Sequence, residues 1–91
     1  MNELKLLTIR VFTSKTCANC PVAKKIACEV AEEFNIRFIE VDIGTSDGQI
    51  EGLMYQITST PSFALDDEII ARGKLIPKED LRAHVKKRLG K

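Results

Sequence analysis

Hydrophobic and polar positions along this chain repeat with two different periods. Near-continuous or alternating apolar runs predict strands at residues 6–12, 36–43, 61–65 and 68–71. Apolar residues spaced three and four apart predict helices at residues 21–34 and 77–89. Strands and helices therefore alternate in the first half of the chain, and a pair of strands followed by a helix occupies the second half.

Residues with special backbone preferences mark the ends of these elements. Pro21 suits the first turn of a helix, where its missing N–H is not needed. Asn35 suits the left-handed position that ends a helix. The pair Asp66-Asp67 predicts a tight hairpin between the last two strands. Pro77 and Gly90 mark the start and the end of the final helix.

A third, shorter helix is predicted after the second strand, beginning at Ser46. Ser46 and Gln49 resemble a capping box, in which side chains at the start of a helix satisfy free backbone N–H groups. The glycines at 48 and 52 lower the helix propensity of this segment. Four apolar residues recur at helical spacing and are expected to face the core: Ile50, Leu53, Met54 and Ile57.

The order strand, helix, strand, helix, strand, strand, helix predicts an α/β fold with a four-stranded mixed sheet flanked by three helices. The first two strands, joined by a helix and short links, form a right-handed parallel unit. The last two strands form an antiparallel hairpin. With 91 residues, the chain is long enough for one domain, which we expect to span residues 1–91.

Composition and charge narrow the classes of function. The net charge is +1 and acids and bases are interspersed, which argues against a nucleic-acid groove binder with its basic stripe. The basic residues 86–88 are interpreted as a complement to the dipole of the last helix. No apolar run approaches a membrane span, and residues 1–7 are too short and too charged for a signal peptide. We therefore expect a cytoplasmic protein with no membrane partner. We also expect a monomer, because no exposed apolar stripe is evident.

The segment Cys17-Ala18-Asn19-Cys20 lies between the first strand and the first helix. Two cysteines two residues apart can close a small disulfide ring or share a metal ion. A reducing cytosol does not favour a structural disulfide framework, and three cysteines cannot all pair within one chain. Cys17 precedes a helix, whose positive N-terminal field favours a thiolate, the form of cysteine that attacks disulfides. These points favour a redox function over a metal site.

Two alternatives stay open at this point. Structural zinc needs four ligands, and the chain offers one close cysteine pair, while Cys28 lies inside a helix and His84 is remote. A dimer could supply two pairs, or hold an iron–sulfur cluster between subunits with help from glutathione. The other alternative is an adaptor that uses its fold for binding only. Cys28 is interpreted as a small buried hydrophobe, with a regulatory thiol or an intermolecular disulfide as its alternatives. We expect neither a metal nor a cofactor.

The cysteine motif is followed, forty residues after Cys20, by Thr60-Pro61 at the start of the third strand. Together with the order of elements, this resembles the thioredoxin/glutaredoxin family, specifically its small, minimal-fold branch found largely in archaea. The resemblance covers residues 8–89 and implies a thioredoxin fold. It implies that Cys17 attacks, that Cys20 resolves, and that Pro61 is a cis-proline facing the disulfide.

The same resemblance implies a function and its partners. The protein would reduce disulfides of client proteins and receive electrons from a reductase of the thioredoxin reductase type. The backbone of Thr60 would bind an extended segment of the client. Further candidate contacts are Thr16, Ala18, Asn19 and Gly73.

The chain also departs from both branches of the family. Typical thioredoxins carry Trp before the first cysteine, Gly-Pro between the two, and a buried acid on the preceding strand; here those positions hold Thr16, Ala18-Asn19 and Val11. Glutaredoxins usually show Thr-Val-Pro and a later Gly-rich loop that binds glutathione, whereas Gly73 is followed here by Lys74. A glutathione-dependent, glutaredoxin-like reductase is therefore kept as the alternative activity.

Overall fold

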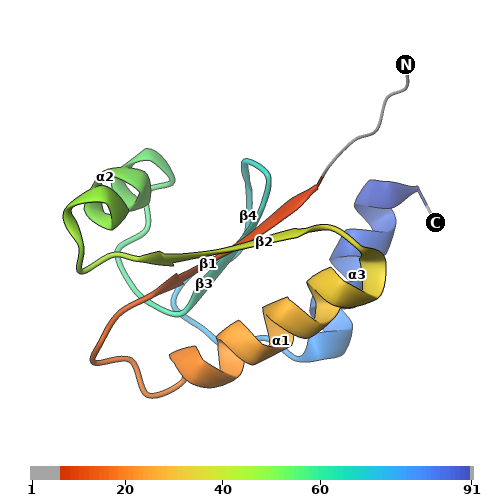
Figure 1. Ribbon diagram of the computed structural model, residues 1–91, viewed down its shortest axis with the longest axis horizontal. Coiled ribbons are helices and arrows are strands. Elements are labelled where there is room, and N and C mark those ends of the chain that lie inside the picture. The colour runs from red at the N-terminus through yellow and green to blue at the C-terminus, as the bar shows by residue number, and fades with distance from the viewer. Residues whose placement is uncertain (1–6, 91) are drawn as a thin grey trace.

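The computed structural model describes residues 7–90, so Leu6 of the first expected strand lies outside the described residues. Within this range the elements follow the predicted order (Figure 1). Their bounds are β1 (Thr8–Thr13), α1 (Cys20–Phe34), β2 (Arg37–Asp42), α2 (Ser46–Met54), β3 (Ser62–Leu65), β4 (Glu68–Ala71) and α3 (Lys78–Leu89). The predicted bounds differ from these by one or two residues at most ends, and by more at the end of α2.

The sheet has the strand order β2-β1-β3-β4. Strand β1 pairs parallel to β2 and antiparallel to β3, and β3 pairs antiparallel to β4. The predicted four-stranded mixed sheet is confirmed. Because β1 and β2 run in parallel, their carboxyl ends meet at one edge of the sheet, and the loop that carries the cysteines leaves from that edge (Figure 1).

The two faces of the sheet carry cores of different size. Helices α1 and α3 cover one face, where Ile9, Val11, Phe63 and Leu65 of the sheet pack against α1 and α3. Helix α2 lies over the other face, where the buried cluster contains Phe12, Val41, Ile57 and Ala64. Most of the apolar area that stabilises the fold is therefore buried on the side of α1 and α3.

An ion pair joins the two helices of the larger layer. Arg82 of α3 donates hydrogen bonds to both carboxylate oxygens of Glu33 on α1, at 2.8 Å from Nε to Oε1 and 2.6 Å from Nη2 to Oε2. The hydrogen bond from Arg82 lowers the pKa of Glu33, and the positive charge of the guanidinium lowers it further. This exposed bidentate pair fixes the contact between the helices more than it stabilises the fold.

The predicted turn residues take the conformations that the sequence indicates. Asn35 and Gly90 end α1 and α3 with left-handed backbone, at φ of 55° and 76°. Asp66 opens the hairpin between β3 and β4 at a φ of 53°, and its side chain accepts a hydrogen bond from the Thr8 N–H. These chain reversals are confirmed.

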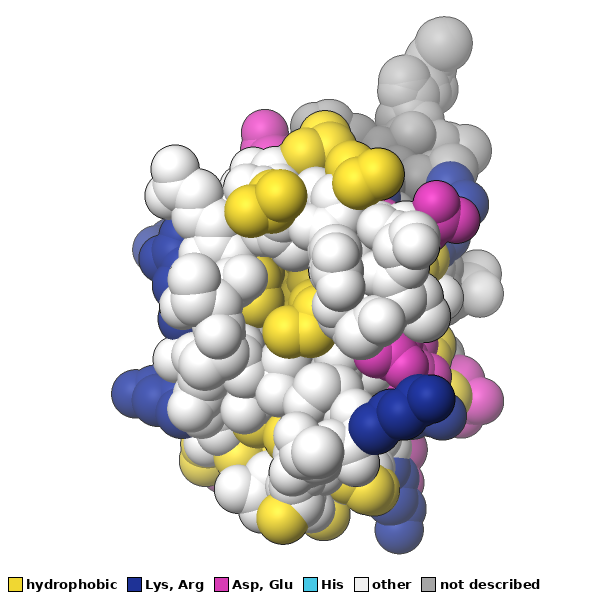
Figure 2. Space-filling model, turned by 90° about the vertical axis from the view of Figure 1, so that its left-hand side faces the viewer, with side chains coloured by type: hydrophobic (Ala, Val, Ile, Leu, Met, Phe, Trp, Pro, Cys, Tyr) yellow, Lys and Arg dark blue, Asp and Glu magenta, His cyan; other side chains and the backbone are white. Residues whose placement is uncertain are grey.

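The predicted core face of α2 is wrong. Helix α2 ends at Met54, and the side chains of Ile50, Leu53 and Met54 are exposed by 60%, 78% and 75%. Figure 2 shows hydrophobic side chains gathered near the top of this end of the molecule, over α2. Ile57 is buried, but it follows the helix. A monomer is predicted because no exposed apolar stripe is evident; α2 carries such a stripe, so that reason fails and the monomer stays a prediction.

Glycines explain why α2 turns this way. Gly48 and Gly52 are its buried residues, and they lie against the chain at the end of β2. A Cβ on Gly48 would lie 2.6 Å from the carbonyl carbon of Asp42 and closer still to its oxygen. The helix therefore packs against the sheet through its two glycines, and its apolar side chains point to solvent. The predicted capping box is also replaced, since the Thr45 hydroxyl accepts the Gly48 N–H at 3.0 Å.

Candidate active site

The two cysteines of the motif form a disulfide at the start of α1. Their Cα atoms are 5.4 Å apart. Cys20 is the first residue of the helix and is 4% exposed, whereas Cys17 lies in the preceding loop and is only partly buried. Reagents in solvent therefore reach Cys17 more easily than Cys20.

The N-terminus of α1 is left open toward this disulfide. Its N-cap residue, Asn19, makes no side-chain capping hydrogen bond, and the first turn contains no acid. Pro21 occupies the first turn, where a free N–H would otherwise point out of the helix. The positive end of the helix dipole is thus not neutralised by the helix's own side chains, and it stabilises negative charge that forms on the sulfur atoms.

The loop before β3 lies beside the cysteine loop. The peptide bond between Thr60 and Pro61 is cis. The hydroxyl groups of Ser14 and Thr60 are 3.1 Å apart and share a hydrogen bond. Pro61 is buried and Thr60 is partly exposed. The structure therefore brings Thr60-Pro61 to the loop that carries Cys17, as the spacing of the two motifs suggests.

Ser62 and Gly73 hold this loop in place. The hydroxyl of Ser62, fully buried, donates to the carbonyl of Ser59 at 2.7 Å and accepts the Gly73 N–H at 3.0 Å. Gly73 has a φ of 69°, and a Cβ there would lie 3.1 Å from the Cβ of Ser59 and closer to its hydroxyl. Gly73 thus shapes the loop that carries Thr60; its contact with a client stays a prediction.

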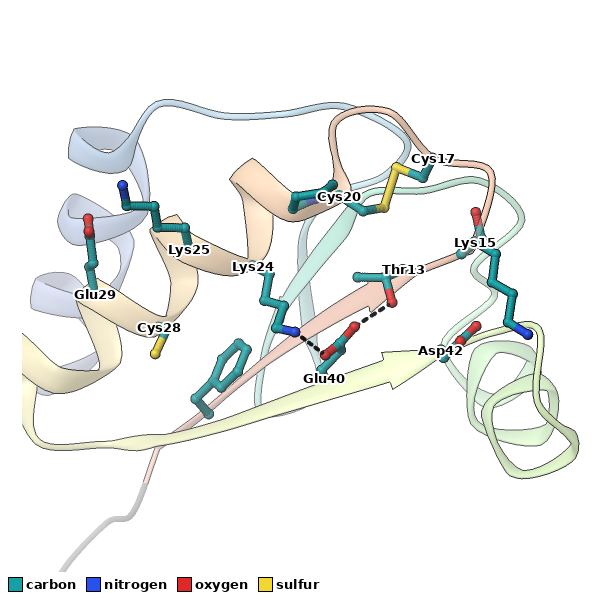
Figure 3. A pocket seen from close by; sticks show the side chains of 13 residues that line it. Thr13, Lys15, Cys17, Cys20, Lys24, Lys25, Cys28, Glu29, Glu40 and Asp42 are labelled. Atoms are coloured by element: carbon teal, nitrogen blue, oxygen red, sulfur yellow. Dashed lines mark hydrogen bonds and ion pairs between the residues drawn. A yellow bond between two sulfur atoms is a disulfide. The ribbon is translucent and has the colours of Figure 1, made fainter.

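A cavity of about 610 Å³ opens on the side of the disulfide that faces β2 (Figure 3). It is lined by the sulfur-bearing residues Cys17, Cys20 and Cys28, by Thr13, Ser14, Lys15, Pro21, Lys24, Lys25 and Glu29, and by Phe38, Glu40 and Asp42 of β2. Cys28 is a free, partly buried cysteine, so its interpretation as a small buried hydrophobe is only partly right. Neither Thr60 nor Pro61 lines this cavity.

Within the cavity, Glu40 connects β2 to both neighbouring elements. Its Oε2 accepts a hydrogen bond from the Thr13 hydroxyl at 3.0 Å, and its Oε1 lies 3.1 Å from Nζ of Lys24 (Figure 3). Sequence reasoning missed Glu40, Ser14 and Ser62. Strand alternation could have found Glu40, because it places this residue on the same face of β2 as Phe38, at the carboxyl edge of the sheet.

The other candidate residues are distributed as follows. Thr16, Ala18 and Asn19 are exposed around the disulfide, and their contact with a client stays a prediction. His84 is exposed on α3. In residues 7–90 no three His, Cys, Asp or Glu side chains are grouped so that they could hold a metal ion. No helix in that range is both long enough and apolar enough to cross a membrane.

Comparisons with known proteins agree on one family. A family model described as "Thioredoxin domain" matches residues 7–86. A protein of Archaeoglobus fulgidus named as a probable thioredoxin is 31% identical over 86 residues, which cover 93% of this chain and 92% of that protein. A thioredoxin of Methanocaldococcus jannaschii is 33% identical over 82 residues, which cover 89% and 94%. The solved structure of thioredoxin-2 from a malaria parasite superposes with a TM-score of 0.74 at 19% identity, covering 94% of this chain and 86% of that one. At that identity the structural likeness concerns the fold alone.

Proposed function

Since the chain belongs to the thioredoxin family, we propose that it reduces disulfides of client proteins through the Cys17–Cys20 dithiol. The observation that carries the proposal is the unequal exposure of the two cysteines at an uncapped helix N-terminus. The more accessible sulfur is the attacking one, and the buried sulfur is kept for the second step. A reductase of the thioredoxin reductase type restores the dithiol, and the reaction takes place in the cytoplasm.

The reaction is two successive thiol–disulfide exchanges. The thiolate of Cys17 attacks one sulfur of the client disulfide, forms a mixed disulfide and releases the other client sulfur as a thiolate. Cys20 then loses its proton and attacks the sulfur of Cys17, which closes the Cys17–Cys20 ring and releases the second client sulfur. The client gains two electrons and the dithiol loses two.

Client binding is assigned to the loop on the other side of the disulfide. No hydrogen bond joins the main chain of Thr60 to another of residues 7–90, so its N–H and carbonyl are available to an extended client segment, as in strand addition. The exposed residues Thr16, Ala18 and Asn19 border the same sulfur atoms. They would contact the client without taking part in the exchange.

Cysteine substitutions test the assignment of roles. The assay is reduction of insulin disulfides with dithiothreitol as the electron source. Cys17→Ser is expected to abolish the catalysed rate, because no thiolate attacks. Cys20→Ser is expected to accumulate a mixed disulfide between Cys17 and the client, visible by mass spectrometry. Cys28→Ser is the matched control and is expected to keep the parent rate. Full activity in Cys17→Ser would refute the proposal.

The equilibrium reduction potential of the Cys17–Cys20 pair tests the direction of the reaction. A single two-electron transition near about −270 mV supports a donor of electrons, whereas about −180 to −120 mV indicates an oxidase or isomerase. The glutaredoxin-like alternative is tested in the same way, by asking whether glutathione sustains turnover of the oxidised protein. Faster recycling by glutathione than by a thioredoxin reductase would favour that alternative.

A further inference from the structure

The second exchange of the proposed function requires a group that accepts the proton of the Cys20 thiol. Only a thiolate attacks a disulfide, so Cys20 must lose its proton before it closes the ring. Cys20 is 4% exposed, and burial disfavours the charged form of a thiol. Val11, which lies under α1 on the preceding strand, is apolar and fully buried and cannot accept a proton. The proton of Cys20 therefore goes to another residue around it or to water.

The cavity beside Cys20 contains three carboxylates, and two of them are paired with residues that do not line it. Glu29 forms an ion pair with Lys78 of α3, at 3.3 Å. Asp42 accepts the N–H of Gly44 at 2.8 Å and so shapes the turn after β2. The remaining charged residues of the lining are Lys15, Lys24 and Lys25, which are donors at neutral pH. Glu40 is the carboxylate whose own partners, Thr13 and Lys24, both line the cavity.

Glu40 is placed where it can serve this role. Its Cα pairs with that of Val11 in the parallel register of β1 and β2, so Glu40 lies one strand away from that apolar position. In Figure 3 the Thr13 hydroxyl and the Glu40 carboxylate lie in the space below the disulfide. The side chain of Glu40 is 36% exposed, and the cavity has room for water to join it to Cys20.

We propose that Glu40 accepts the proton of Cys20 through the cavity when the mixed disulfide is resolved, with Thr13 and Lys24 holding its carboxylate. The proton leaves the Cys20 sulfur and is taken up by the carboxylate. The sulfur lone pair then forms the bond to Cys17, and the bond between Cys17 and the client breaks. The departing client thiolate is protonated from solvent, and Glu40 returns its proton to solvent. This inference rests on the proposed function.

Lys24 balances the negative charge of Glu40. An unpaired carboxylate near Cys20 would oppose the formation of a second negative charge on the sulfur. Lys24, one helical turn after Cys20, lies 3.1 Å from Glu40 and balances that charge. The pair therefore presents a carboxylate oxygen to the cavity without a net negative field. Glu40 takes up the proton through water in the cavity, so no contact between its carboxylate and the Cys20 sulfur is needed.

The test isolates the resolving step with a small disulfide probe. Reduced protein carrying Cys28→Ser is mixed with dithiobis(nitrobenzoate), which releases one coloured thiolate when Cys17 attacks and a second when Cys20 closes the ring. The rate of the second release is measured from acid to alkaline pH in the parent, in Glu40→Gln and in Glu29→Gln. Glu29→Gln is the matched control, because it removes the same charge from the same cavity.

The two roles of Glu40 predict opposite results. If Glu40 is the proton acceptor, Glu40→Gln slows the second release about tenfold at neutral pH, which is less than the 10²–10⁴-fold typical of a fixed base. The pH at which the rate is half-maximal then moves upward by about one unit. Glu40→Asp recovers part of the rate. If Glu40 acts only as a negative charge, Glu40→Gln makes the second release faster. A faster or unchanged second release overturns the inference.

Failure of the proposed function is distinguishable from failure of this inference. A parent protein that releases only one thiolate would refute the resolving role of Cys20, and with it both proposals. A parent with two releases and an unaffected Glu40→Gln would refute the role of Glu40 alone. If Glu40→Gln does not fold, Thr13→Val removes the hydroxyl that holds Oε2, and it must slow the second release while leaving the first unchanged.

Discussion

Two glycines of the same helix are expected to respond in opposite ways to the same substitution. Gly48 and Gly52 both lie on the buried edge of α2, one turn apart. A Cβ on Gly48 would meet the backbone of Asp42, at 2.6 Å from the carbonyl carbon, and the Thr45 hydroxyl, at 2.9 Å. A Cβ on Gly52 would meet a methyl group of Ile43 at 3.4 Å, which is an ordinary contact.

The magnitudes follow from these contacts. Alanine is favoured over glycine inside a helix by about 1 kcal/mol. At Gly52 nothing opposes this gain, so Gly52→Ala should raise the free energy of unfolding by about 0.5–1 kcal/mol. At Gly48 the helix must move away from β2, which costs about 1–3 kcal/mol as overpacking. The hydrogen bond of the Thr45 cap is also lost, at about 1 kcal/mol. Gly48→Ala should therefore destabilise the protein by about 2 kcal/mol.

The assay is reversible thermal and urea unfolding of both variants with the Cys17–Cys20 disulfide kept oxidised. For a domain of this size, about 2 kcal/mol lowers the melting temperature by roughly 10 °C. The far-ultraviolet circular dichroism of the folded variants shows whether α2 is retained. If Gly48→Ala is as stable as the parent, α2 does not lie against Asp42 with its glycine edge, and our explanation of its exposed apolar residues is wrong.

Three further predictions follow from other contacts in the structure. Leu53→Ser should change the free energy of unfolding by less than about 0.5 kcal/mol, whereas Leu81→Ala should cost about 2–5 kcal/mol, both measured by urea unfolding. Because Arg82 lowers the pKa of Glu33, the stability gained from that pair is present above pH 4.5 and is lost as the pH falls through the lowered value. The stability difference between parent and Glu33→Gln should therefore shrink in acid, and also in high salt. Gly73→Ala, at a positive φ, should lower the melting temperature and slow client reduction together.

The order of elements could be predicted from the sequence because each strand and each long helix has a clear hydrophobic period. The turn residues Asn35, Asp66 and Gly90 supported this order by marking where α1, β3 and α3 end. The outward face of α2 could not be predicted in the same way, because periodicity identifies an apolar face without saying what that face contacts. The spacing of Gly48 and Gly52, one turn apart, was the signal that a second backbone comes close.

Some residues of the candidate site could be predicted from the sequence and others could not. Cys17, Cys20 and Thr60-Pro61 are recognisable because their residue types and spacing are unusual. Glu40 is an ordinary charged residue in an alternating strand, and its meaning depends on Thr13 and Lys24, which lie 27 and 16 positions away in the sequence. Such a cluster exists only once the strands are paired, so single-sequence patterns do not reveal it.

The unequal layers of the fold have a consequence for its motions in the native state. The layer formed by α2 is thin, and it is attached to the sheet by its glycine edge, the small cluster around Phe12 and the Arg10–Glu51 ion pair. Local opening is easiest where few apolar groups are buried. The amide hydrogens of α2 should therefore exchange with deuterated solvent earlier than those of α1 and β1. The cysteine loop belongs to the thicker layer, so α2 can open and close without loosening the frame that holds the two sulfur atoms.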